Sequence, residues 1–163
     1  MRTRTFIAAM ATAVAAFCTP ALAEEKEPTA VIAIGGQGEW GLPGPTSFGP
    51  SVSVEFTPIK DWLEIEIGAA SMFRRGATEL ETDLVFKKPF TISDQFEFMV
   101  GAGPAWSYTR AEGTKWGATV ALDFMMWPWP EHKFGWFVEP SYTYTQDSEK
   151  SLAVSVGFLI AIP

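Results

Sequence analysis

The stretch of sequence that decides the fold is Ser151-Leu152-Ala153-Val154-Ser155-Val156-Gly157-Phe158. Every even-numbered residue in this stretch is bulky and apolar, and every odd-numbered residue is small. Because successive side chains of a β-strand point to opposite faces, the stretch predicts a strand with one apolar face. The other face suits a space that is crowded or wet.

The same alternation recurs in seven earlier runs, each bounded by clusters of Pro, Gly, Asp or Lys. The expected strands are residues 29–38, 48–57, 62–73, 78–87, 95–106, 115–126, 134–145 and 151–162. Each is about as long as the roughly 9 to 11 residues that a tilted membrane strand needs. The short connections between them favour antiparallel neighbours. The sequence therefore predicts an all-β domain over residues 29–163, an eight-stranded antiparallel up-and-down transmembrane β-barrel.

The two faces of these strands differ sharply in composition. One face is dominated by Trp, Phe, Tyr, Leu, Ile and Val, whereas the other is rich in Gly, Ala and Ser. The second face also carries nine carboxylates: Glu55, Glu64, Glu66, Glu79, Glu81, Asp83, Glu97, Asp123 and Glu139. The choice of which face lies inside the barrel therefore decides the class of protein.

Two interpretations of the alternation invert the barrel. In a membrane barrel the bulky apolar face meets lipid, and the small polar face fills the lumen. In a soluble, lipocalin-like periplasmic carrier, the apolar face lines a cavity for an apolar ligand. The interior of an eight-stranded barrel is only just wide enough for its own side chains, so the bulky face would overfill it. Aromatic residues also gather near the strand ends, as in the belts at a membrane interface. We therefore expect the membrane barrel.

The inward carboxylates are the difficulty for this interpretation. Within the expected strands, Lys87 and Lys115 are the cations that share their face. Unpaired buried charge is costly. We expect lumenal water, shared protons, bound cations or arginines folding in from the rim to supply the balance. The rim arginines are Arg74, Arg75 and Arg110.

The N-terminus predicts export. Arg2 and Arg4 precede an apolar core and an Ala21-Leu22-Ala23 cleavage site, which is the pattern of a secretory signal peptide over residues 1–23. Cys18 offers a lipoprotein alternative, but Phe17 stands before it where a small residue is usual. Residues 24–28 form an acidic lead-in. The mature chain would carry 12 − 2 = 10 basic and 19 acidic residues, a net charge of −9 that argues against nucleic acid as a partner.

The last strand carries the most specific family pattern. Residues Ser155-Val156-Gly157-Phe158-Leu159-Ile160-Ala161-Ile162 fit the motif polar-x-Gly-x-x-apolar-x-apolar. With this motif, the chain resembles the small outer-membrane β-barrel proteins of Gram-negative bacteria, the OmpA/OmpX-type or porin-like group. Pro163 stands where many members of the group have Phe or Trp.

The resemblance implies a location in the cell outer membrane, with both termini periplasmic. It also implies contact with outer-membrane lipid and recognition of Ser155 to Ile162 by the barrel-assembly machinery. The segments around residues 41–45, 74–77, 110–113 and 146–150 would then lie outside the cell.

His132 is the only histidine, so any histidine-based mechanism would need it. Some small barrels modify lipid A with Ser and His acting together. The deacylase pattern has a Ser two residues after the His, and here that residue is Phe134. We expect a solvated turn histidine, no catalytic residues and no cofactor.

Two sets of acids are candidate ligands for a hard cation such as Ca²⁺, which prefers oxygen ligands: Glu64 with Glu66, and Glu79 with Glu81 and Asp83. Because strand side chains alternate with a period of two, the members of each set lie on one face of their strand. Filling of the lumen is the simpler interpretation. Gly35-Gly36-Gln37-Gly38 is not followed by a helix, so it does not indicate a phosphate loop. Arg74, Arg75 and Arg110 are candidates to bind lipopolysaccharide phosphates at the outer rim, with simple solvation as the alternative.

These observations together predict an outer-membrane barrel with a packed polar lumen, a structural or interaction role and no wide pore. A periplasmic carrier and, less favoured, a lipid A modifying enzyme are the alternatives.

Overall fold

The computed structural model describes residues 28–163, which form one closed antiparallel barrel. Its strands are β1 (Ala30–Gly41), β2 (Thr46–Ile59), β3 (Leu63–Arg74), β4 (Ala77–Ser93), β5 (Phe96–Thr109), β6 (Gly113–Met126), β7 (Phe134–Thr145) and β8 (Lys150–Ile162). Each strand pairs with the next, and β8 closes the barrel against β1. The predicted fold class is confirmed. The expected signal peptide and most of the acidic lead-in lie outside the described residues.

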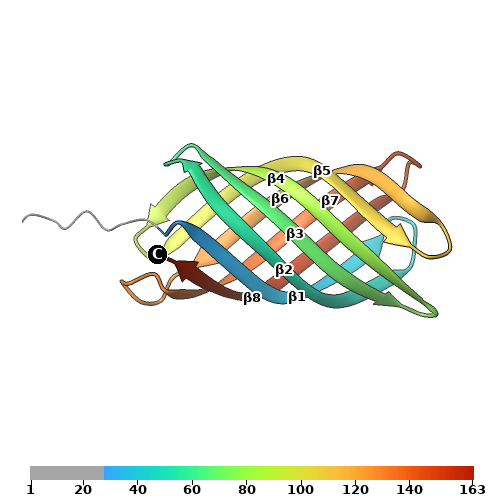
Figure 1. Cartoon of the computed structure of the whole chain (residues 1–163), viewed down its shortest axis with the longest axis horizontal. Coiled ribbons are helices and arrows are strands. Elements are labelled where there is room, and N and C mark those ends of the chain that lie inside the picture. Colours follow the sequence, from blue (N-terminus) through green and yellow to red (C-terminus); the bar gives the residue numbers. More distant parts are fainter. Residues whose placement is uncertain (1–27) are drawn as a thin grey trace, which may run out of the picture.

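The two ends of the barrel are easily told apart (Figure 1). We call the end that holds the start of β1 and the end of β8 the terminus end, and it also holds the turns at residues 60–62, 94–95 and 127–133. We call the opposite end the loop end, with connections at residues 42–45, 75–76, 110–112 and 146–149. Connections at the loop end are as short as turns. Among the described residues, no helix is long and apolar enough to cross a membrane.

Strand β4 is longer than the sequence predicted. Residues 88–94 separate two of the expected strands, but β4 continues to Ser93 and pairs with β5 along this extension, with a shift in register between Thr91 and Ser93. Proline has no N–H to donate to a neighbouring strand, so it is tolerated where one edge of its strand has no neighbour. The last pair between β3 and β4 is Glu64 with Lys87, so Pro89 lies beyond the end of β3. The extension moves Lys87 from the end of a strand to its interior.

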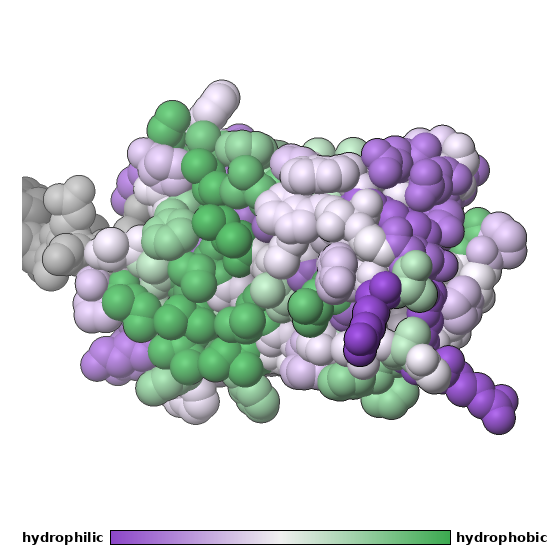
Figure 2. Space-filling view, turned by 45° about the vertical axis from the view of Figure 1, so that its right-hand side comes forward, coloured by the Kyte–Doolittle hydropathy of each residue, from purple (hydrophilic) through white to green (hydrophobic). Residues whose placement is uncertain are grey.

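The bulky apolar face points outward, as expected for a membrane barrel. Phe158 is 73% exposed, and many other large apolar residues along the strands are exposed too. On the visible face in Figure 2, apolar residues form a band towards the terminus end, and hydrophilic residues gather at the loop end. A lipocalin-like carrier needs the same residues inside. That alternative is wrong for this barrel, because its outer surface takes the side chains that would line such a cavity.

The interior is layered rather than uniformly polar. A cluster of buried apolar residues fills the lumen on the terminus side: Ala33, Met99, Met125, Trp127, Phe137 and Leu159. Val31 and Ala161 pack against it. The prediction of a packed polar lumen is therefore right for only part of the interior. Methionine suits this position, because its unbranched side chain fills irregular gaps between the curved walls.

The seam between β1 and β8 depends on two facing glycines. Gly35 lies directly opposite Gly157 in the register of this pair. A Cβ atom on either glycine would collide with the backbone of the other strand. Only glycine can be accommodated at both positions, so the first and last strands approach closely here.

Candidate functional site

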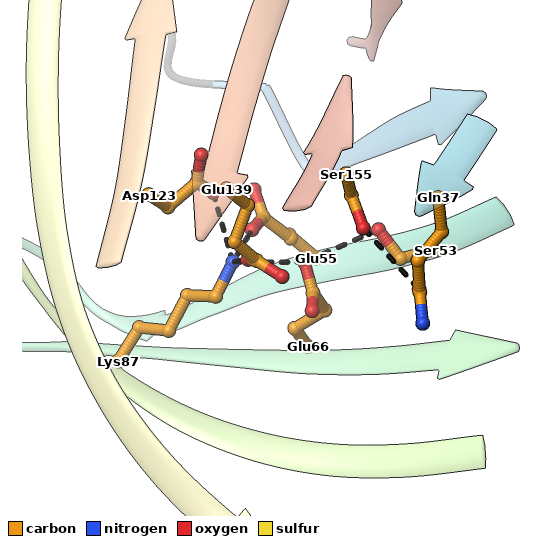
Figure 3. Close-up of polar contacts among 8 residues, drawn as sticks. All are labelled: Gln37, Ser53, Glu55, Glu66, Lys87, Asp123, Glu139 and Ser155. Carbon is orange, nitrogen blue, oxygen red and sulfur yellow. Dashed lines mark hydrogen bonds and ion pairs between the residues drawn. The ribbon is translucent and has the colours of Figure 1, made fainter. Parts of the chain in front are cut away.

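The most unusual group in the interior is a lysine that holds four carboxylates. Lys87 Nζ lies 2.7 Å from Glu55 Oε1, 2.8 Å from Glu66 Oε2, 2.8 Å from Asp123 Oδ2 and 2.7 Å from Glu139 Oε2. The lysine side chain is 0% exposed. We call these five residues the Lys87 cluster. Figure 3 shows Lys87 reaching from the wall towards carboxylates from several strands.

The cluster draws its members from five strands of the barrel. Glu55 comes from β2, Glu66 from β3, Lys87 from β4, Asp123 from β6 and Glu139 from β7. Strand β5 contributes space, since Gly101 lies opposite Lys87. A Cβ atom at Gly101 would lie 2.7 Å from Lys87 Cγ. The glycine therefore lets the lysine side chain lie along the wall of β5 and extend its ammonium group into the middle of the lumen.

The cluster is a charged layer across the barrel, next to the apolar layer. One ammonium and four ionised carboxylates sum to 1 − 4 = −3. Ser53 Oγ also donates to Glu66 Oε2, at 3.1 Å. Charges removed from water require close partners, because desolvation is expensive. The cluster and the apolar layer together separate a cavity at the loop end from a cavity at the terminus end.

The loop-end cavity has a volume of about 330 Å³ and an acidic wall. Gln37 Nε2 donates to Glu81 Oε2 at 2.7 Å, and Ser155 Oγ donates to Gln37 Oε1 at 3.2 Å. Ser47 Oγ donates to Glu39 Oε2 at 3.1 Å. Gln37 and Ser47 thus donate hydrogen bonds to Glu81 and Glu39, two carboxylates that Lys87 does not contact. The cavity is lined by polar groups and suits water and small polar solutes.

Ion pairs cross the rim at the loop end. Lys115 Nζ lies 2.8 Å from Glu149 Oε2 and 3.0 Å from Glu112 Oε2. The hydrogen bond from Lys115, together with its charge, holds the pKa of the Glu112 carboxyl below its usual value. Arg74 lies 4.0 Å from Glu79 and 3.9 Å from Glu112. We call Arg74, Glu79, Glu112, Lys115 and Glu149 the rim pairs.

The rim arginines divide into two kinds. Arg74 turns towards the acids of the rim pairs, as expected for an arginine that balances lumenal charge. Arg75 and Arg110 are exposed in their turns at the same end. These two arginines are therefore available to external anions, whereas Arg74 is already engaged.

The five candidate metal ligands do not converge on one point. Glu66 joins the Lys87 cluster, Glu79 the rim pairs, and Glu81 the wall of the loop-end cavity. Asp83 lines that cavity as well, and Glu64 lines the terminus-end cavity of about 1140 Å³. Within residues 28–163, one group of three acids brings an oxygen each within 4.8 Å of the others, namely Glu55, Glu66 and Asp123. The ammonium of Lys87 contacts all three.

His132 lies in the turn between β6 and β7, at the terminus end, as expected from the sequence. Its ring stacks on Trp127, with 5.7 Å between the ring centroids. It lines the terminus-end cavity with Glu131 and Lys133. The expectation that this histidine has no catalytic role stays a prediction.

The fold defines a class of protein, because closed barrels of eight antiparallel strands with apolar outer walls are the architecture of the small outer-membrane barrels. The structure is similar to Neisserial surface protein A, with a TM-score of 0.67 and 13% identity over 82% of this chain and 97% of that chain. It is also similar to the outer membrane protein OprG of Pseudomonas aeruginosa, with a TM-score of 0.62 and 12% identity over 83% and 97%.

A third similar structure is Ail, the attachment invasion locus protein of Yersinia pestis. Its TM-score is 0.59, with 14% identity over 82% of this chain and 98% of that chain. The resemblance expected from the sequence is confirmed by these structures, and at such identities it concerns the fold. No protein-family model matches the chain, and no curated protein matches it.

Proposed function

We propose that this chain is exported to the outer membrane of a Gram-negative bacterium and acts there as a structural or interaction protein of the cell envelope. The single observation that carries the proposal is the exposed apolar outer wall of a closed barrel. Exposed apolar surface of this extent is unfavourable in water and is the surface that lipid covers. The structural neighbours, which include outer membrane proteins, support the same location.

The layered interior supports a role without a wide pore. The apolar layer and the Lys87 cluster each span the lumen, one directly above the other along the barrel axis. Met99 and Leu159 in the apolar layer and Lys87 in the cluster are almost fully buried. Eight strands leave little room beyond their own side chains. A solute would have to displace both layers to pass.

Arg75 and Arg110 are proposed to contact lipopolysaccharide phosphates at the loop end. Both are exposed there, and arginine binds phosphate through two parallel hydrogen bonds. Residues Ser155 to Ile162 are proposed to be the segment that the barrel-assembly machinery recognises. In support of this, they form the end of the last strand, and the outward residues Val156 and Phe158 are exposed.

Cell fractionation tests the location. We expect the protein in the outer-membrane fraction, extractable by detergent, with gel mobility that changes on heating because the folded barrel resists unfolding by detergent. Recovery in the soluble periplasm would contradict the proposal. For lipopolysaccharide, Arg75→Ala with Arg110→Ala should weaken binding of the purified barrel to lipopolysaccharide vesicles, and Lys133→Ala at the terminus end is the matched control. If the arginine variant and the Lys133→Ala control bind lipopolysaccharide equally well, the proposed contact of Arg75 and Arg110 with the phosphates is wrong.

A further inference from the structure

All four carboxylates of the Lys87 cluster bind the lysine through one oxygen, and in two of them the second oxygen is buried without a partner. Glu55 binds through Oε1 and Asp123 through Oδ2. With both groups ionised, Glu55 Oε2 and Asp123 Oδ1 are buried and receive no hydrogen bond from residues 28–163. Each residue is 2% exposed. Buried polar atoms in folded proteins are almost always hydrogen-bonded, so this pair of oxygens indicates a missing partner.

The same two carboxyl groups lie in contact. Glu55 is within hydrogen-bonding reach of Asp123 and also of Glu66. Ionised carboxylates only accept hydrogen bonds, so two of them cannot bond to each other. A proton on Glu55 or Asp123 turns one group into a donor. One proton shared by the two groups therefore supplies a hydrogen bond that two ionised carboxylates cannot form.

The charges around Glu55 favour the same assignment. It is faced by Lys87 from β4, Glu66 and Glu64 from β3, and Asp123 from β6. Glu139 from β7 shares the ammonium. A proton reduces the charge of the Lys87 cluster from −3 to −2, since the sum becomes 1 − 3. Like charges in a dry interior repel strongly when they are not compensated, so a proton that neutralises one of these carboxylates is favourable.

A metal ion would have to enter a space already held by an ammonium group. The three acids that approach within 4.8 Å of one another are the ones that Lys87 contacts. A divalent cation there also needs about six or more oxygen ligands. The proton needs only the contact that the two carboxyl groups already make.

We propose that the Lys87 cluster contains a buried proton-binding site, in which Glu55 and Asp123 share one proton at neutral pH. The site goes beyond the proposed role at the envelope and does not depend on it. It makes the layer that closes the lumen responsive to pH.

Infrared spectroscopy of the folded barrel in detergent tests the site directly. Wild-type protein at neutral pH should show the carbonyl stretch of a protonated carboxylic acid. The wild-type minus variant difference spectrum should contain this band for Glu55→Gln and for Asp123→Asn. Glu149→Gln at the exposed rim is the matched control and should leave the band unchanged. If neither cluster variant removes intensity, the shared proton is disproved.

Stability against pH gives a second measurement. A proton held by the folded state and not by the unfolded state stabilises the barrel at low and neutral pH, and this contribution is lost as pH rises. The melting temperature of wild type should therefore fall on the alkaline side, and that of Glu55→Gln should fall less. Glutamine can donate as the protonated acid does, so failure of both Glu55→Gln and Asp123→Asn to fold also counts against the proposal. If the purified protein instead contains stoichiometric metal that a chelator removes, and Glu55→Gln and Asp123→Asn lose that metal, the site binds a cation and the proposal is wrong.

Discussion

Lys87 and Lys115 make ion pairs of nearly equal length in very different surroundings. Lys87 lies 2.7 to 2.8 Å from its four carboxylates, and Lys115 lies 2.8 and 3.0 Å from its two. The partners of Lys87 are at most 12% exposed, whereas Glu112 and Glu149 are 50% and 59% exposed. Solvent screens the exposed rim pairs, whereas the Lys87 cluster is buried away from the solvent surface. Burial rather than distance therefore decides what each lysine contributes.

The largest effect should come from removing the buried charge. Lys87→Met leaves four carboxylates facing one another without a cation, and loss of one member of a buried ion pair typically costs about 3 to 5 kcal/mol. That is a large part of the stability of a typical domain. We expect the unfolding midpoint in urea, followed by tryptophan fluorescence in detergent, to fall sharply, or the barrel not to form.

The neighbouring lysine supplies the control for this substitution. Lys88 is half-buried and donates to the backbone oxygen of Asp61 near the turn between β2 and β3. Its ammonium lies 5.6 Å from the centre of the Phe90 ring. Lys88→Met should cost on the order of 1 kcal/mol, the usual value of one hydrogen bond. Equal losses at Lys87 and Lys88 would contradict the distinction between buried and solvated charge.

A smaller loss is expected in the apolar layer. Leu159 is 0% exposed in the lumen, and its neighbour Phe158 is 73% exposed on the outer wall. Leu159→Ala should lower the free energy of unfolding by about 2 to 5 kcal/mol through the cavity that it leaves. Phe158→Ala removes more atoms but leaves no cavity inside. If Phe158→Ala proves the more harmful in the same detergent, the apolar layer is not a packed core.

The rim should respond least. Lys115→Ala removes a solvated pair, for which roughly 0 to 1 kcal/mol is typical. Its signature is electrostatic: the pKa of Glu112, held low by Lys115, should rise towards its usual value in a carboxyl NMR titration. In wild type, the stabilisation from this pair is present above the usual carboxyl pKa and is lost as pH falls through the lowered value. An unchanged Glu112 titration would show that the contact is not formed in solution.

The barrel itself could be predicted because a period of two is a local signal. Alternation along β8 gave both the strand and its orientation, and the width of an eight-stranded barrel then placed the bulky residues outside. β7 was predicted with the bounds that the structure has. The apolar layer was harder to foresee, because Met99 and Leu159 are scattered among small residues and meet only when distant strands close the barrel.

The Lys87 cluster was not predicted, because the fourth expected strand covers residues 78–87 and so ends before Pro89, whereas β4 continues to Ser93. Its members were identified as inward-facing residues, but Lys87 was the last residue of its expected strand. A signal was present: Phe90 and Ile92 continue the outward apolar alternation of β4, and they are 47% and 64% exposed. The choice of Lys87 as the centre could not be predicted, since it depends on the stagger between β3, β4 and β5.

The glycine pair between β1 and β8 has a consequence for the time course of folding. Gly35 and Gly157 lie on the first and last strands, so their contact has among the greatest sequence separations in the barrel. Pairings between distant segments form late, because the entropy of closing the intervening chain is lost before any contact compensates it. Seven hairpin-type pairings can form between neighbours, whereas this one must wait for a nearly complete sheet. Pairing of β1 with β8 is thus the folding step that turns an open sheet with two exposed edge strands into a closed barrel. The closed barrel has no free strand edge through which chains could aggregate.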